Sequence, residues 1–290
     1  MIYLLLLLST ILSAGKALSC KKIGVTGSSF RELMSLNAGV FAVATLCVLL
    51  TIINKTGLLV GISAYSLGLS VAFASVMVFT QITQAAAMSR GSSSATVLVY
   101  SCGFLLPIVW SSVFYDENIT YMQIAGVAVL IISLYFIISP SKDSKLSFVW
   151  LVFAVMSMVG SGVTAIIQKI HQHSPYAYEL RPFLVYTFFF CALFCLLLTL
   201  LTSKETQSKS TAKERVSLSA VSGLFVGILN ILNLTLAGKI PAVVLFPVYN
   251  VGGMILTGIM GTLIFKEKNT PKQLLGFGIG CVAIIIIGVL

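Results

Sequence analysis

The chain has 290 residues, of which 58% are hydrophobic and only 9% are charged, and its mean hydropathy is +1.05. A soluble domain carries roughly 25% charged residues, so this composition excludes a water-soluble fold of this size. The net charge of +10 does not indicate nucleic-acid binding, because the basic residues lie in short connections between apolar runs, where they flank a membrane.

Apolar runs of the length of membrane-spanning helices follow one another along the chain. A helix needs about 20 apolar residues to cross a bilayer. The first run, 1–19, resembles a signal peptide, but no basic residue precedes it and the residues before Cys20 fit a cleavage site poorly, so we predict a retained helix. Nine further helices are predicted at 30–53, 64–87, 92–115, 120–138, 146–170, 182–202, 216–237, 241–265 and 271–290.

The two halves of the chain share one design. A constant shift of 150 positions aligns Gly103 with Gly253, Leu106 with Leu256, Glu117 with Glu267, Thr120 with Thr270, Gln123 with Gln273 and Gly126 with Gly276. Five helices per half is an odd number, so the second half enters the membrane inverted relative to the first. We therefore predict an all-α integral membrane protein with ten transmembrane helices as a 5+5 inverted repeat. The repeats are 1–140 and 141–290, within one membrane domain.

Several motifs resemble those of a known superfamily. They are the run A-A-A-M-S-R-G-S-S-S-A at 85–95, the acidic turn Asp116-Glu117, and Phe-Lys-Glu-Lys at 265–268 before the last helix. Together with the ten-helix plan, they resemble the EamA-like families of the drug/metabolite transporter superfamily. The stretch 249–253 is similar to the glycine-rich kink of the small multidrug resistance branch. The resemblance covers essentially the whole chain and implies a carrier that uses no ATP, with its substrate left open.

The chain departs from the small multidrug resistance proteins at one position. Those proteins carry a membrane-embedded glutamate in the first helix, whereas this chain has Ile11 there, with Thr10 beside it. No predicted span has Asp or Glu near its middle, because Glu32 and Glu179 lie at helix edges and Asp116, Glu117 and Glu267 lie in turns. This absence argues against proton or cation antiport coupled through a carboxylate, and leaves facilitated diffusion or exchange open.

Uncharged polar residues inside the predicted spans are the first candidates for a substrate cavity. They are Thr80, Gln81 and Gln84 in the third span, Asn230 and Asn233 in the eighth, and Tyr100, Tyr249 and Asn250 in the repeat-related fourth and ninth. A buried amide needs a hydrogen-bond partner, which either a substrate or a neighbouring helix supplies. Both readings stay open, and Asn230 is the first choice for a substrate contact.

Basic residues at helix ends allow two interpretations. Lys16 is either a cavity cation for an anionic or zwitterionic solute or, as its place near the helix end favours, a side chain that snorkels to the interface. Lys169 and Lys239 are predicted to be interfacial. His171 and His173 do not share a helix face, so we predict a solvated loop and no metal site.

Glycine and proline mark places where helices bend or approach closely. Gly103, Gly252 and Gly253 suit close approach, and Pro107 and Pro247 each remove a backbone hydrogen bond within a span. Kinked helices suit alternating access but also occur in static membrane bundles.

The predicted function is secondary transport of a small organic metabolite or drug-like solute by alternating access. The alternatives are a flippase for a lipid-linked intermediate and a non-transporting membrane scaffold. No nucleophile, acid and base cluster in the spans, so we predict neither an enzyme nor a cofactor. The expected partners are the solute and the lipid bilayer, without nucleic acid, for a monomer or a homodimer in the cell membrane.

Two arguments about orientation disagree. The superfamily resemblance places both termini in the cytosol. That orientation would leave only four of the 18 basic residues in cytosolic connections, namely Lys55, Lys169, Arg181 and Lys239. Because basic residues in short loops are retained on the cytosolic side, the charges favour both termini outside.

Overall fold

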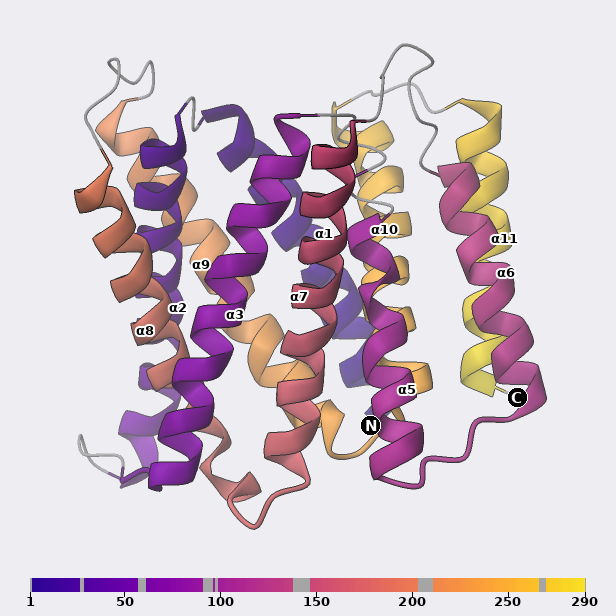
Figure 1. The fold of residues 1–290 in the computed structure, drawn as a ribbon, viewed down its shortest axis with the longest axis horizontal. Helices are drawn as coiled ribbons and strands as arrows, with labels where there is room; N and C mark the ends of the chain where they lie inside the picture. Colours follow the sequence, from indigo (N-terminus) through magenta and orange to yellow (C-terminus); the bar gives the residue numbers. More distant parts are fainter. Residues whose placement is uncertain are drawn as a thin grey trace. The chain divides into compact units, whose positions relative to one another are not determined.

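The computed structural model describes residues 2–26, 29–56, 61–90, 96, 99–137, 147–202, 211–265 and 270–289 (Figure 1). The described residues form helices joined by turns, without a strand among them. The helices are α1 (Ile2–Thr26), α2 (Phe30–Thr56), α3 (Ala64–Met88), η1 (Cys102–Phe104), α5 (Leu105–Phe114), α6 (Tyr121–Ile137), α7 (Phe148–Gln172), η2 (Ala177–Glu179), α8 (Leu180–Leu201), α9 (Ala212–Ala237), α10 (Ala242–Phe265) and α11 (Pro271–Val289). The predicted all-α class is confirmed for this part of the chain.

Some helix boundaries match the sequence prediction, and others differ by a few residues. α3 begins at Ala64 and α11 at Pro271, as expected. α1 continues to Thr26, past the expected end at Ser19. By length and composition, five described helices suffice to cross a membrane: α2 over Phe30–Ile52, α3, α7, the η2–α8 stretch Ala177–Leu201, and α9.

The chain divides into two compact units, each of which contains helices from both predicted halves. Unit 1 comprises Met1–Ile11, Phe79–Lys169 and Leu236–Leu290, and unit 2 comprises Leu12–Val78 and Ile170–Thr235. Unit 1 therefore holds α5, α6, α10, α11 and most of α7. Unit 2 holds α2, α8 and most of α3 and α9.

In unit 1, α6 and α11 pack side by side and begin with the same cap (Figure 1). At the start of α6, the Thr120 N–H donates to Gln123 Oε1 (3.1 Å) and the Gln123 N–H donates to Thr120 Oγ1 (3.2 Å). Thr270 and Gln273 make the same two bonds at the start of α11, at 2.8 and 3.3 Å. Each is a capping box, which satisfies two backbone donors that the first helical turn leaves free.

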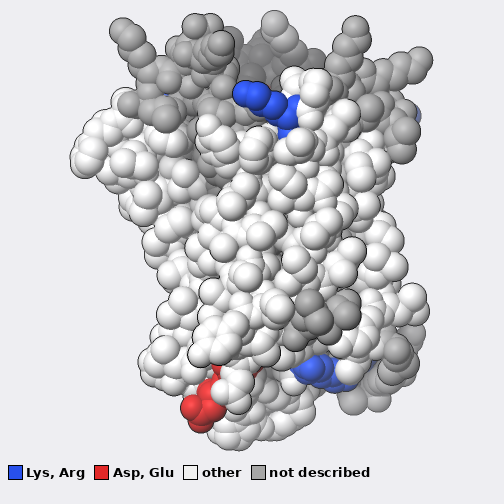
Figure 2. All heavy atoms as spheres, turned by 90° about the vertical axis from the view of Figure 1, so that its right-hand side faces the viewer, with Lys and Arg blue, Asp and Glu red and all other residues white. Residues whose placement is uncertain are grey.

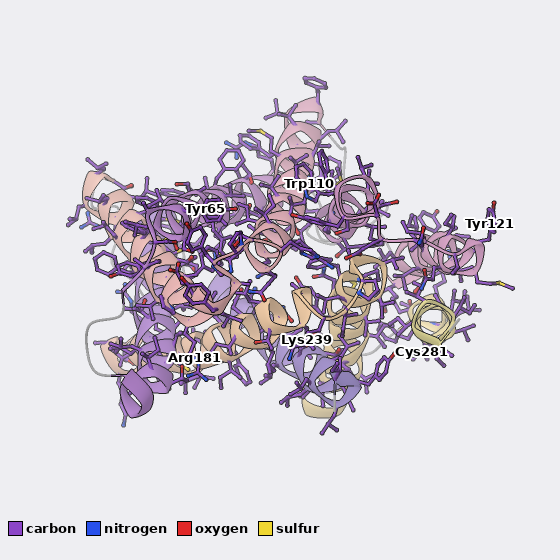
Figure 3. All side chains as sticks on the ribbon, turned by 90° about the horizontal axis from the view of Figure 1, so that it is seen from below. Tyr65, Trp110, Tyr121, Arg181, Lys239 and Cys281 are labelled. Atoms are coloured by element: carbon purple, nitrogen blue, oxygen red, sulfur yellow. The ribbon has the colours of Figure 1, made fainter. Side chains whose placement is uncertain are left out.

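Reciprocal glycine contacts join α6 to α11. A Cβ on Gly126 would lie 2.7 Å from Ile287 Cγ1, and a Cβ on Gly276 would lie 2.9 Å from Ile137 Cγ1. Ser133 also donates a hydrogen bond to the Gly276 carbonyl (2.8 Å). Gly126 and Gly276 are 150 positions apart, and so are Ile137 and Ile287. The 150-residue shift therefore converts each of the two contacts into the other. Seen from below, Tyr121 of α6 and Cys281 of α11 mark the neighbouring helices, and Tyr121 points away from the pair (Figure 3).

Unit 2 is built around the pair α2 and α8. Phe41 of α2 stacks on Phe188 of α8 with ring centroids 6.2 Å apart. Arginines close both ends of this pair, because Arg31 donates to the Thr202 carbonyl (2.9 Å) and Arg181 to the Thr51 carbonyl (3.0 Å). The Thr202 carbonyl follows the last residue of α8, where a helix end leaves it without an intrahelical partner.

Charged side chains gather at the ends of the face that Figure 2 shows. Lys and Arg atoms are visible at its upper and lower ends and acidic atoms at its lower end, and the described surface between them is uncharged (Figure 2). Many of the apolar side chains that point outward are large, including Leu50, Val109, Tyr135 and Leu200, each at least 60% exposed. An apolar exterior of this kind suits hydrocarbon rather than water.

Candidate functional site

Three of the predicted cavity residues come together in unit 1. The side chains of Tyr249 and Asn250 form a hydrogen bond, and Tyr100 lies close enough to Tyr249 to interact with it electrostatically. Phe246 meets the Tyr249 ring edge to face at 6.1 Å. All three polar side chains are partly exposed. The structure therefore brings the repeat-related positions Tyr100 and Asn250 to one place, with an aromatic wall and two hydroxyl groups.

The polar residues at the end of α3 form a second group in unit 1. Thr80 is buried and packs tightly on α7, since a Cβ on Gly160 would lie only 2.1 Å from Thr80 Oγ1. Gln81 and Gln84 are partly buried. Gln81 Oε1 is itself inaccessible and has no hydrogen-bond partner among the described residues. Thr80 thus has a packing role, and Gln81 is the residue of this group with unused hydrogen-bonding capacity.

In unit 2, buried polar residues form a stripe along α9. Asn230 donates from Nδ2 to the Val226 carbonyl (2.9 Å), and Ser219 donates to the Leu36 carbonyl of α2 (3.2 Å). Asn233 Oδ1 and Ser222 Oγ have no hydrogen-bond partner within the described part of the chain. Asn233 follows Ser222 by eleven residues, close to three helical turns, so the two share one line of the helix. Sequence analysis missed Ser219 and Ser222, because serine is common in apolar helices.

Lys16 is the one charged residue among the predicted cavity candidates. It lies on α1, in the segment of unit 2 that begins at Leu12, and it is partly exposed. Its role as a cavity cation stays a prediction.

The predicted bend in the fourth span is local and has an identifiable cause. Residues Cys102–Phe104 form a 3₁₀ turn directly before α5. Pro107 lacks the N–H that would bond the Gly103 carbonyl, and its ring crowds that carbonyl, so the helix tightens there. Gly103 also lies against α7, where a Cβ would be 2.6 Å from the Met158 carbonyl oxygen.

The predicted bend residues of the ninth span lie within a continuous helix. Pro247 is inside α10, and the buried Gly252 and Gly253 follow it. A Cβ on Gly252 would lie 2.9 Å from Thr10 Cγ2, so this position allows close approach to α1.

A buried ion pair joins three segments of unit 1. Lys169, at the end of α7, pairs with Glu117 of the connection between α5 and α6. Lys169 Nζ also donates to the Ile240 carbonyl (3.0 Å), and the Ala242 N–H donates to Glu117 Oε2 (2.6 Å). Glu117 therefore caps the start of α10, where a negative charge meets the positive end of the helix dipole. We call Glu117, Lys169, Ile240 and Ala242 the Glu117 junction.

The prediction for Lys169 was wrong. The side chain does not reach the interface, because the residue is 1% exposed. Its partners come from connections 50 to 70 residues away in sequence, and they satisfy its charge inside the protein.

A second buried carboxylate caps α3 in unit 2. Glu179 accepts hydrogen bonds from the Ser63 N–H (3.1 Å), the Ser63 hydroxyl (2.7 Å) and the Ser66 hydroxyl. Ser66 Oγ lies 3.5 Å from His171 Nε2, and Gln172 Nε2 lies 3.3 Å from His171 Nδ1. We call Glu179, Ser63, Ser66, His171 and Gln172 the Glu179 junction.

The donors of the Glu179 junction determine the histidine tautomer. A carboxylate only accepts, so the single hydroxyl proton of Ser66 points to Glu179 and Ser66 Oγ must accept from His171. Nε2 therefore carries the proton, and Nδ1 accepts from the Gln172 amide. The prediction of a solvated His171 was wrong: the residue is fully buried, with its ring stacked 4.1 Å from that of Phe183. His173 is exposed, as predicted.

Other kinds of site find no support in the described residues. No three His, Cys, Asp or Glu side chains lie close enough there to hold a metal ion. An open apolar groove of about 270 Å³ lies on α5, and none of its lining residues is a predicted site residue: Leu105, Leu106, Val109, Trp110, Val113, Phe114 and Ile166.

Comparison with known proteins identifies a fold but not a family. No family model matches the chain, and no curated protein matches it. One solved structure, described only as a crystal structure of a protein, is similar over 98% of this chain and 97% of its own, with a TM-score of 0.79 and 12% sequence identity. At that identity the similarity shows a shared fold alone.

Proposed function

We propose that this chain is a multi-pass membrane carrier of the EamA-like, drug/metabolite transporter type, which moves a small organic solute without ATP. The apolar helices, their outward apolar side chains and the uncharged middle of the face in Figure 2 support a place in the bilayer. Ten helices of a 5+5 inverted repeat, as in the sequence prediction, suit this assignment.

The observation that carries the proposal is the exchange of contacts between α6 and α11. Gly126 meets Ile287, and Gly276 meets Ile137. A two-fold relation between the two halves produces this pattern, because each contact is repeated by the residues 150 positions away. The pairing of α2 with α8, again related by the 150-residue shift, agrees with it. Internal repeats with inverted topology are typical of secondary transporters.

Each unit, taken by itself, has polar groups that can bind a solute. In unit 1, Tyr100, Tyr249 and Asn250 offer hydroxyl and amide groups beside aromatic faces. In unit 2, Asn233 Oδ1 is an acceptor without a partner among the described residues. A small ligand pocket combines apolar walls with a few polar groups of this kind. A solute with both an apolar body and hydrogen-bonding groups fits this chemistry.

The test is reconstitution of the purified protein in liposomes. We expect flux of a small organic solute, lowered by Tyr249→Phe and by Asn230→Ala while expression and unfolding temperature stay near those of the native protein. Scrambling of a labelled lipid without solute flux would support the flippase instead. Neither activity would support a scaffold. Native flux in both variants would reject these residues as solute contacts.

A further inference from the structure

The Glu117 junction lies where the chain leaves unit 1 and where it re-enters it. The chain leaves unit 1 after Lys169 and returns to it at Leu236. Lys169 bonds the Ile240 carbonyl, four residues after the return, and Glu117 bonds the Ala242 N–H. One carboxylate and one ammonium group thus tie the exit, the return and the α5–α6 connection together.

Stability alone is a weak reason for a buried ion pair. Removing two charges from water is costly, and an apolar pair of similar volume is often at least as stable. The turn beside Glu117 adds strain, since Asp116 has φ of +50° and is the one non-glycine residue with positive φ among those described. That conformation is unfavourable for a residue with a Cβ, although aspartate tolerates it better than most. The junction and the turn beside it therefore each contain a feature that stability alone would not select.

Both charges can return to water if the junction opens. Lys169 lies three residues before the end of α7, and its long side chain can extend past the helix end to solvent. Glu117 lies in a connection, with 17% of its side chain exposed. Opening thus recovers hydration for both ions, which offsets the lost attraction. The closed and open arrangements differ far less in free energy than they would for a deeply buried pair.

We propose that Glu117 and Lys169 form a latch that closes this end of unit 1 and opens once in each transport cycle. This inference rests on the proposed carrier function and adds to it the residues that control the cycle. Lys169 and Glu117 act by positioning the α5–α6 connection and the start of α10, without contact with solute.

The test measures the opening directly, by the distance between two spin labels. Labels on Asn118→Cys and Lys239→Cys, both exposed, report the separation of the α5–α6 connection from the α9–α10 turn in a variant without the native cysteines. Lys239 is labelled in Figure 3. The native pair should give one main short distance. Glu117→Gln with Lys169→Met should add a longer-distance population, without a fall in unfolding temperature.

A matched control separates the latch from a general effect of charge removal. Lys213 and Glu214 are exposed neighbours on α9, so Lys213→Met with Glu214→Gln removes the same charges elsewhere. This control should leave the distance distribution unchanged. Two outcomes would overturn the latch and leave the junction a purely structural contact. One is an unchanged distance distribution in the Glu117→Gln and Lys169→Met double variant. The other is a lower unfolding temperature with the short distance retained.

The outcome is independent of the test of transport. The distances are measured on purified protein in lipid nanodiscs without solute, so absence of solute flux leaves them readable. Flux with unchanged distances rejects the latch and keeps the carrier. A longer-distance population without flux of any solute would show that the junction opens, and would reject its role in transport.

Discussion

The Glu117 and Glu179 junctions both cap a helix start with a carboxylate, but the partners of the two carboxylates differ in charge. In each, a carboxylate from a short segment between long helices caps the start of a distant helix: the partly buried Glu117 caps α10 in unit 1, and the buried Glu179 caps α3 in unit 2. Glu117 has one full cation as its partner, whereas the described partners of Glu179 are a backbone N–H, two hydroxyls and a histidine beyond them. The first arrangement concentrates its energy in one pair, and the second distributes it over several neutral bonds. Loss of one partner should therefore matter most at Glu117.

The largest effect is expected from Lys169→Met alone. It leaves the partly buried Glu117 carboxylate without its cation, and because this carboxylate can turn to water, the free energy of unfolding should fall by about 3 kcal/mol, the lower end of the range for a broken buried pair. Thermal or denaturant unfolding of the purified protein measures this. Lys239→Met, which removes an exposed lysine, should change little. Equal effects of the two variants would show that the ion pair contributes no more than a surface charge.

An intermediate effect is expected from Glu179→Gln. The amide oxygen still accepts hydrogen bonds, but they lose their charge assistance and the amide protons need new acceptors, so the loss should be about 1–3 kcal/mol. The exposed Glu214→Gln is the control. A loss at Glu179 as large as that of Lys169→Met would contradict the distributed arrangement.

A smaller loss is expected from Ser66→Ala. It removes one of the bonds to Glu179 and leaves the His171 N–H without its acceptor, at a cost of about 1 kcal/mol. Ser75→Ala on the same helix removes an exposed hydroxyl that bonds only the Val71 carbonyl, so it should be close to neutral. Chemical modification of the two histidines provides a second readout: His171 should become reactive in Ser66→Ala, whereas His173 reacts in the native protein too.

The smallest change, of opposite sign, is expected from Asp116→Gly. Glycine adopts the left-handed conformation without a Cβ penalty, which should stabilise the turn after α5 by up to about 1 kcal/mol. The unfolding temperature measures the gain. A loss of stability would show that the Asp116 side chain contributes more than its backbone conformation costs.

Local sequence signals predicted the helices well. Pro271 begins α11, the Thr-x-x-Gln sequences at 120 and 270 become capping boxes, and Gly126 and Gly276 align because each lies against the other helix. These features depend on neighbours in sequence or on the repeat. A residue pattern with a period of 150 positions is visible without coordinates.

The two junctions could not be predicted from the sequence, because the residues that form each of them come from segments far apart along the chain. A lysine or histidine at the end of an apolar helix is usually solvated, and nothing near Lys169 or His171 in sequence indicates otherwise. Lys169 is buried against Glu117 and Ile240, and His171 against Ser66, which bonds Glu179. All of these except Glu179 are more than 50 residues away in sequence. The available hint was Glu117, an acidic residue that both halves carry in the same turn.

The packing of α6 against α11 has a consequence for how the protein is made. Ile287 leaves the ribosome some 160 residues after Gly126, and α8 likewise follows α2 by about 150. Under the membrane assignment, α6 is inserted early and keeps its Gly126 and Ser133 face without its native partner until α11 arrives. This helix pair is therefore completed only when α11 has been made. A chain that stops before Pro271 lacks half of this helix pair, and we expect quality control to remove it.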